Sequence, residues 1–202
     1  MQTTLKNFIV FEGLDGAGTT TQLHLLSKQY KDKGIECFET FEPTDNPIGR
    51  LVRSILRKEV TVTAWSLALL YSADREEHLH DKQEGIIQQL EQKKLVVCDR
   101  YFYSSLAYQG VDCDFANVMS INEYPHPEFV FYIDTPVEEC IARIEKRGKE
   151  KELFEKTDFL TKVKANYEKA FSLLPRETNL IRLDGKVSIA KINEEVRKVL
   201  FP

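Results

Sequence analysis

The chain has 202 residues, of which 42% are hydrophobic and 30% are charged, and its formal net charge is −4 at pH 7. These values are typical of one globular domain spanning residues 1–202, and they argue against a disordered chain, a membrane protein or a nucleic-acid-binding protein. The N-terminal apolar run is too short for a signal peptide, so we expect a cytoplasmic location and no membrane partner. The four cysteines form no Cys-x-x-Cys pair, which predicts neither a zinc site nor a disulfide framework.

Five short apolar runs, rich in β-branched or aromatic residues, predict buried strands. Longer segments with helical periodicity alternate with them, which predicts an α/β fold with a parallel sheet covered by helices on both faces. The predicted strands are 7–12, 35–41, 95–98, 129–134 and 179–183. The predicted helices are 20–33, 65–93, 137–146, 159–174 and 188–200.

Ligands of such sheets bind beyond the carboxyl ends of the strands. We therefore expect the chemistry at the residues where the predicted strands end, which are Gly13, Glu42, Asp99 and Asp134.

The segment 13–22, GLDGAGTTTQ, joins the first predicted strand to an apolar helical pattern. Its glycines can turn backbone N–H groups toward a phosphate, and the helix N-terminus adds partial positive charge. Gly13 and Gly18 have the spacing of the phosphate-loop pattern, and Thr20 can ligate Mg²⁺, but Thr19 stands where lysine is expected. On the loop alone, a simple glycine-rich turn remains the alternative interpretation.

The segment 145–156, EKRGKEKELFEK, is densely charged around one glycine. Composition alone favours a solvated surface loop. The alternative is a short lid that closes over a polyphosphate.

Several segments, in the same order along the chain, resemble those of thymidylate kinases. The opening FEGLDGAGTTTQL and the block DRYFYSSLAYQG are the most specific. The match also covers the pairs Glu42-Pro43 and Ile133-Asp134, and it extends from about residue 6 to residue 185. The resemblance implies a P-loop kinase fold, Mg²⁺-dependent transfer of the γ-phosphoryl group of ATP to dTMP, and a homodimer formed through the helices between residues 64 and 93 and the helix after Tyr101.

The acceptor pocket can also be argued from the residue types. A monophosphate needs arginines with several donors, and Arg53 and Arg100 follow the ends of predicted strands. Tyr71 and Arg75 are four residues apart on a predicted helix, so they share a face on which a base can stack and form hydrogen bonds. The alternatives are surface salt bridges for the arginines and a core position for Tyr71.

The resemblance completes the candidate site. It implies that Gln109 lies near the base edge, that Arg143 lies against adenine, and that Asp15 helps to place the acceptor. The expected dTMP-binding residues are Glu42, Pro43, Arg53, Tyr71, Arg75, Arg100, Ser104, Tyr108 and Gln109. The expected ATP-binding residues are Gly13, Leu14, Asp15, Gly16, Ala17, Gly18, Thr19, Thr20, Thr21, Arg143 and Lys186. The expected metal-binding residues are Thr20 and Asp99, and the expected catalytic residues are Asp15, Arg100, Arg147, Lys149 and Lys151.

The sequence departs from the family pattern near the phosphates. Thr19 replaces the loop lysine, and Glu152-Leu153 replaces the Asp-Arg of the bacterial lid, so two positive charges are missing. Such charges stabilise phosphoryl transfer. Either other cations supply them, or the protein is a weak kinase or a silent nucleotide-binding protein. A kinase for a different nucleotide or nucleoside is a further alternative. The candidate cations are Arg53, Arg143, Arg147, Lys149 and Lys151.

Overall fold

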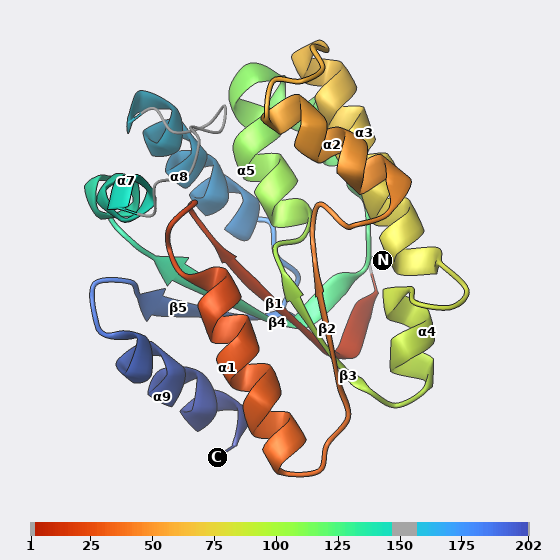
Figure 1. The fold of residues 1–202 in the computed structure, drawn as a ribbon, viewed down its shortest axis with the longest axis vertical. Helices are drawn as coiled ribbons and strands as arrows, with labels where there is room; N and C mark the ends of the chain where they lie inside the picture. Colours follow the sequence, from red (N-terminus) through yellow and green to blue (C-terminus); the bar gives the residue numbers. More distant parts are fainter. Residues whose placement is uncertain (1–2, 147–156, 202) are drawn as a thin grey trace.

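The structure is a computed structural model that describes residues 3–146 and 157–201. In this part of the chain, five parallel strands form one sheet in the order β2-β3-β1-β4-β5 (Figure 1). The predicted α/β fold with a five-stranded parallel sheet is therefore confirmed. The strands are β1 (Thr4–Gly13), β2 (Cys37–Phe41), β3 (Leu95–Asp99), β4 (His126–Asp134) and β5 (Asn179–Asp184).

The strand order places the helices in two layers. The connection from β1 to β2 crosses the sheet in one direction, and the three later connections cross it in the other. Because parallel crossovers are right-handed, α1 must lie on one face and the later connecting helices on the opposite face. Figure 1 shows α1 beside α9, the helix that follows β5. The helices are α1 (Thr19–Asp32), α2 (Pro47–Leu56), α3 (Ala64–His80), α4 (Ile86–Glu91), α5 (Phe102–Asp112), α6 (Phe115–Ser120), α7 (Val137–Lys146), α8 (Thr157–Phe171) and α9 (Ile189–Leu200).

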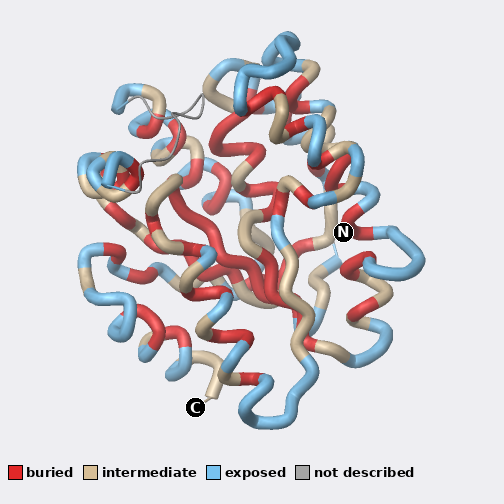
Figure 2. The backbone as a smooth tube through the Cα atoms, viewed as in Figure 1, coloured by how far each residue is buried: buried red, intermediate tan, exposed pale blue. Residues whose placement is uncertain are grey.

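The central strands of the sheet are the most deeply buried. Three of its strands contribute runs that are almost fully buried, which Figure 2 shows as the red centre of the fold. Strands covered on both faces need continuous apolar sequence rather than alternation, and this explains why these strands were recognisable. The buried runs are 8–11, 96–98 and 130–133.

The single helix predicted over 65–93 is wrong, because the structure has α3 and α4 with a turn between them. At this turn the Asp81 carboxylate accepts the backbone N–H groups of Gln83 (2.8 Å) and Glu84 (2.7 Å). The N–H of Gly85 donates to the carbonyl of Asp81 (3.0 Å). An aspartate side chain that takes up nearby N–H groups competes with the helical hydrogen-bond pattern.

The helix α2 was absent from the prediction although its start is encoded locally. Asn46 is its N-cap and accepts the N–H of Gly49 (2.8 Å), and Pro47 occupies the first helical position. Both are strong helix-start signals. Most of the predicted lid, residues 147–156, lies outside the described residues. No helix in the described ranges is long and apolar enough to cross a membrane.

A buried carboxylate ties the two helices of one layer to the central strand. Glu12, near the end of β1, is fully buried and accepts the N–H of Tyr101 (2.9 Å) and the hydroxyl groups of Ser104 (2.6 Å) and Tyr167 (2.9 Å). Ser104 lies on α5 and Tyr167 on α8. Burial raises the pKa of Glu12 to about 7, although these hydrogen bonds and the charge of Arg100 act in the opposite direction.

We predict that Glu12 makes the protein measurably less stable as the pH rises from 4.5 to 7. In this interval the folded chain holds a proton at Glu12 that the unfolded chain releases, so the free energy of unfolding falls as the pH rises and levels off above about 7. A shift of this size corresponds to roughly 3 kcal/mol. Urea unfolding of the parent and of Glu12→Gln from pH 5 to 8 isolates the effect as the difference between the two curves.

The same substitution at the exposed Glu36 is the control, because it should leave the pH dependence of the parent unchanged. A pH-independent difference between the parent and Glu12→Gln would contradict the prediction.

Candidate active site

The loop between β1 and α1 is built to surround an anion. Gly16 and Gly18 have positive φ values of 86° and 104°, which favour glycine. Gly18 is also the N-cap residue of α1 and has no side chain to occupy the first N–H groups of the helix. These N–H groups and the helix dipole therefore remain available to a phosphate. The structure thus brings the predicted loop residues 13–21 together at the end of the central strand.

Thr20 and Asp99 form the part of the site that suits a metal ion. The hydroxyl of Thr20 donates to Oδ2 of Asp99, at the end of the neighbouring strand β3. Oδ1 of Asp99 is buried and has no hydrogen-bond partner among the described residues. A hydroxyl and a single carboxylate fit Mg²⁺, which usually retains waters and binds substrate phosphates rather than an all-protein cage. Consistently, no cluster of three or more His, Cys, Asp or Glu suited to a metal occurs in the described ranges.

Thr19 packs against the start of the loop. The residue is 6% exposed, and its methyl group lies 3.3 Å from the position that a β-carbon on Gly13 would take. This position therefore contributes packing but no positive charge.

Arg143 joins three segments around the loop. Its guanidinium donates to the carbonyl of Gly185 (2.8 Å) and pairs with Glu139, and it reaches the carbonyls of Gly16 and Ala17 at 3.4 Å. These bonds hold Arg143 beside the loop and the turn after β5. Lys186 follows Gly185 in that turn. Three of the predicted catalytic residues, Arg147, Lys149 and Lys151, lie outside the described residues.

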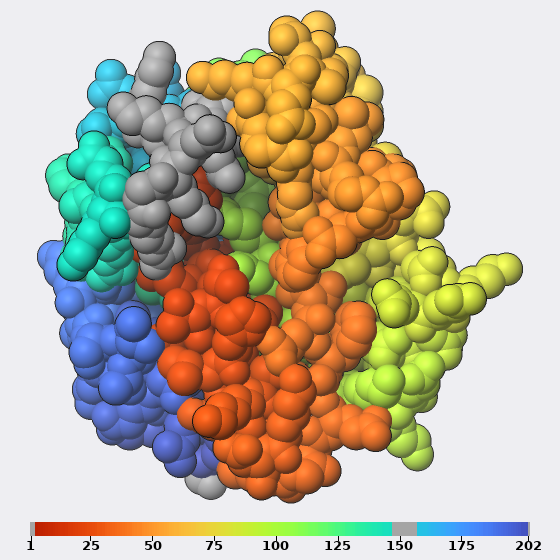
Figure 3. Space-filling model, in the orientation of Figure 1, coloured from red at the N-terminus to blue at the C-terminus, as the bar shows by residue number. Residues whose placement is uncertain are grey.

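A cavity of about 100 Å³ opens beside the loop, and the space-filling view shows this face of the molecule hollowed between the loop region and α2 (Figure 3). Of the nine predicted acceptor residues, only Arg53 is absent from its wall. Arg53 instead donates to the carbonyl of Pro43 and to Asp45 (3.0 Å), so it fastens the loop after β2. The cavity is lined by Asp15, Glu42, Pro43, Leu56, Tyr71, Arg75, Arg100, Tyr101, Ser104, Ser105, Tyr108 and Gln109.

Arg100 links the cavity to the phosphate loop. Its backbone has a positive φ of 71°, which is uncommon outside glycine and is a form of strain often found at functional sites. Its guanidinium donates to Asp15 and to the Ser104 hydroxyl (3.1 Å), and it lies 5.1 Å from the centre of the Tyr108 ring. Burial acts to lower the pKa of Arg100, but the electrostatic effects of Tyr108 and Asp15 act in the opposite direction. The net shift of the pKa is upward, so the side chain stays charged.

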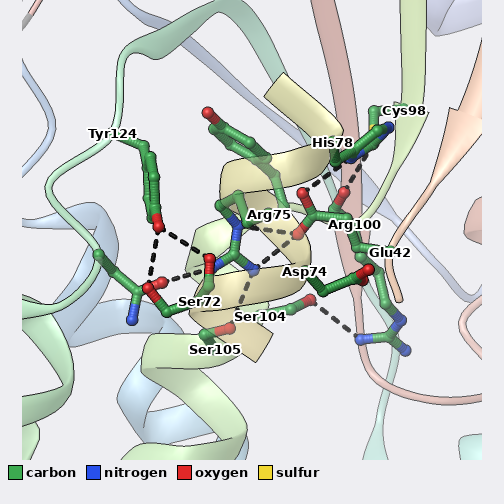
Figure 4. Close-up of polar contacts among 12 residues, drawn as sticks. Glu42, Ser72, Asp74, Arg75, His78, Cys98, Arg100, Ser104, Ser105 and Tyr124 are labelled. Carbon is green, nitrogen blue, oxygen red and sulfur yellow. Dashed lines mark hydrogen bonds and ion pairs between the residues drawn. The ribbon is translucent and has the colours of Figure 1, made fainter. Parts of the chain in front are cut away.

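Arg75 lies in the wall of the same cavity, and Figure 4 shows the polar side chains that contact it. It is 1% exposed, and its charge is matched by Glu42, whose Oε2 accepts both Nε–H (2.9 Å) and Nη2–H (2.6 Å). Further donors go to Ser105 (3.0 Å) and to Asn122. Burial acts to lower the pKa of Arg75, but the Glu42 carboxylate outweighs it, and the net shift is upward.

The hydrogen-bond inventory of Arg75 leaves one N–H for a ligand. A guanidinium has five N–H donors, and four of them are bound within the described protein. The remaining donor is on Nη1. Gln109, in the wall of the same cavity, has a buried Oε1 with no partner in the described ranges. The wall of the cavity therefore contains one residue with a spare donor and one residue with an unpaired acceptor.

Several residues that support the site were not predicted. Asp74 accepts the N–H (2.8 Å) and hydroxyl (2.6 Å) of Thr44 and so anchors the loop after β2, and His78 contacts Glu42 (3.1 Å). Both lie within one helical turn of Arg75, so their spacing in the segment ADREEH is the signal that could have identified them. Asn122 and Tyr167 have no such signal, because their partners are distant in the sequence.

Comparison with known proteins agrees with this geometry. The family model described as "Thymidylate kinase" matches residues 11–196. A protein of Treponema pallidum named "Putative thymidylate kinase" is 42% identical over 95% of this chain and 93% of its own length. Proteins named "Probable thymidylate kinase" are 41% identical in Methanocaldococcus jannaschii, over 94% of this chain and 93% of theirs, and 40% identical in Pyrococcus horikoshii, over 83% and 84%. With its phosphate loop, the adjoining cavity and this similarity over nearly its whole length, the chain belongs to the thymidylate kinase family.

Proposed function

We propose that this protein transfers the γ-phosphoryl group of ATP to dTMP and forms dTDP. The observation that carries the acceptor assignment is that Arg75, with one spare N–H, and Gln109, with an unpaired Oε1, line the same cavity. Family membership supports both the kinase reaction and ATP as the donor.

The free donor and acceptor match one edge of thymine. Thymine O4 accepts a hydrogen bond, so it can bind the N–H of Arg75, while its N3–H can donate to Gln109. Cytosine carries an amino group in place of O4 and an unprotonated N3, so both contacts would become unfavourable. Leaving buried polar groups unpaired is costly, and the cavity should therefore reject dCMP. Tyr71 in the same wall supplies the ring on which the base stacks.

The acceptor phosphate would bind at Arg100. The guanidinium is held by Asp15 and Ser104 at the junction of the cavity and the phosphate loop. A fork of fixed donors suits a phosphate dianion and places it toward the γ-phosphate of ATP in the loop. Phosphoryl transfer needs mainly such positioning and charge stabilisation, because no covalent intermediate with the protein is required.

Mg²⁺ would be held by Thr20 and Asp99, together with the ATP phosphates. When bound, the ion would neutralise charge that develops on the phosphates during transfer. The unpaired Oδ1 of Asp99 supports this assignment.

We further propose that the protein acts as a cytoplasmic homodimer on free nucleotides rather than on nucleic acid. The described cysteines are all free thiols, which suits a reducing compartment. Trp65 (38% exposed) and Leu69 (43%) are four residues apart on α3, so they form an exposed apolar strip of the kind that oligomers bury. Light scattering should then give twice the 23.4 kDa mass of the chain.

A silent nucleotide-binding protein is the second candidate, and Thr19 is the feature that favours it. A coupled assay of ADP release separates the candidates: dTMP should support turnover, dUMP should be a poorer acceptor, and dCMP and thymidine should give almost none. ADP release with thymidine but not with dTMP would identify a nucleoside kinase. Firm binding of ATP and dTMP without ADP release would establish the silent protein.

We predict that Gln109→Leu weakens dTMP binding about tenfold and leaves ATP binding unchanged, because it removes the acceptor for N3–H without creating a buried charge. Arg75→Ala should weaken dTMP binding at least as much and should also lower the melting temperature, because Glu42 loses its counter-ion. Calorimetric titration and thermal unfolding measure the two effects. Arg197→Ala, on the exposed face of α9, is the control and should change neither. Unaltered dTMP affinity in Gln109→Leu would contradict the base-reading role.

We predict that the substitution Thr19→Lys makes Arg147 less important for turnover. Lysine here would contact the β- and γ-phosphates and would act on the rate more than on ATP affinity. The loss of kcat caused by Arg147→Ala should therefore be smaller in Thr19→Lys than in the parent. The test is kcat across the four combinations of the two substitutions. Additive effects would show that Arg147 does not replace the missing lysine.

A further inference from the structure

His78 lies behind the base-reading arginine and not in the cavity wall. Its Nδ1 lies 3.1 Å from Oε1 of Glu42, the carboxylate oxygen that Arg75 leaves unused. Its Nε2 lies 2.5 Å from the hydroxyl of Thr40. When that hydroxyl donates to Nε2, the imidazole proton stands on Nδ1 and donates to Glu42. Both oxygens of Glu42 are then satisfied, one by Arg75 and one by His78.

The four side chains come in two pairs, one on α3 and one at the end of β2. Arg75 and His78 are three residues apart and share a face of α3. Thr40 lies in β2 and Glu42 directly follows the strand, and both side chains contact His78. Figure 4 shows Arg75 and His78 approaching the Glu42 carboxylate together. The orientation of Arg75 is therefore set by a carboxylate that is itself fixed at both oxygens.

His78 also separates the ion pair of Glu42 and Arg75 from solvent. Glu42 and Arg75 line the acceptor cavity, whereas His78 lines a wider cleft of about 720 Å³ bounded by β2, α2 and the end of α3. The side chain of His78 is 5% exposed and that of Glu42 3%, so the contact between them is almost free of solvent. A hydrogen-bonded ion pair is stronger, and better fixed in direction, when water is excluded from it.

We propose that His78 is a positioning residue for acceptor recognition: it locks Glu42 so that Arg75 presents its one free N–H to the base. The inference rests on the proposed function, since the base is taken to be that of dTMP. His78 does not touch the substrate and acts only through Glu42 and Arg75. Removal of the imidazole leaves Oε1 of Glu42 without a partner. The carboxylate can then rotate and draw the guanidinium of Arg75 away from the base.

Two amide substitutions distinguish the two imidazole nitrogens. Asparagine places its amide nitrogen near the position of Nδ1 and can still donate to Glu42, whereas the longer glutamine places its nitrogen near Nε2, which faces Thr40. His78→Gln should weaken dTMP binding about tenfold, and His78→Asn should remain within threefold of the parent. ATP binding should be the same in all three proteins. His80→Gln, on the exposed end of the same helix, is the matched control and should bind dTMP as the parent does.

Calorimetric titration with dTMP and ATP separately measures these affinities, and a coupling test separates positioning from general stability. In an Arg75→Ala background, His78→Gln should have no further effect on dTMP affinity, because there is no guanidinium left to orient. If His78→Gln fails to fold, Thr40→Val breaks the Nε2 contact from the strand and should weaken dTMP binding in the same direction, by a smaller factor.

Equal dTMP affinity in His78→Gln and the parent would overturn the positioning role, as would a parallel loss of ATP and dTMP binding. Either result, obtained with a parent that phosphorylates dTMP, leaves the proposed function intact. A parent that binds ATP but no dTMP would overturn the proposed function and the role of His78 with it.

Discussion

The acceptor side of this protein depends on one buried ion pair, between Arg75 and Glu42. Removing two charges from water costs several kcal/mol per ion, and their attraction offsets that cost only when the other donors and acceptors are also satisfied. The surroundings meet this condition: Ser105 and Asn122 accept from Arg75, and the rings of Tyr101 and Tyr124 lie 5.5 and 5.6 Å from its guanidinium carbon. The ion pair thus requires that the end of β2, α3, α5 and the segment after α6 assemble together, and the complete assembly leaves one N–H of Arg75 without a partner among the described residues.

The donor and acceptor sites are placed side by side by the strand order. β1 lies between β3 and β4, and Phe11 is paired with Asp99, so the loops after β1 and β3 leave the sheet next to each other. Asp15 on one loop and Arg100 on the other can therefore form an ion pair. Glu12 stabilises the same junction from beneath, because it accepts the first N–H groups of the segment that starts α5. A single parallel register thus sets the separation between the phosphate loop and Arg100.

The sequence could predict the parts of this site that follow from local pattern. The central strands are continuous apolar runs, the phosphate loop is contiguous, and Tyr71 and Arg75 share a helical face. The partners of the buried polar groups could not be predicted in this way, because Tyr167 meets Glu12 from 155 positions away and Asn122 meets Arg75 from 47. The break after α3 was missed for a different reason: the Asp81 side chain ends a helix whose apolar periodicity continues on both sides of it.

The phosphate loop and the adjoining cavity differ in the charged side chains that they contain. The cavity wall contains Arg75, Arg100 and Gln109, whereas the loop offers backbone N–H groups and a helix dipole but no charged side chain at Thr19. Two arginines near the loop are held by protein groups: Arg143 pairs with Glu139 and donates to three carbonyl oxygens, and Arg100 pairs with Asp15. In the described residues, side-chain positive charge is therefore a feature of the cavity wall and of the arginine that borders the loop, whereas the loop itself relies on its backbone N–H groups and the helix dipole.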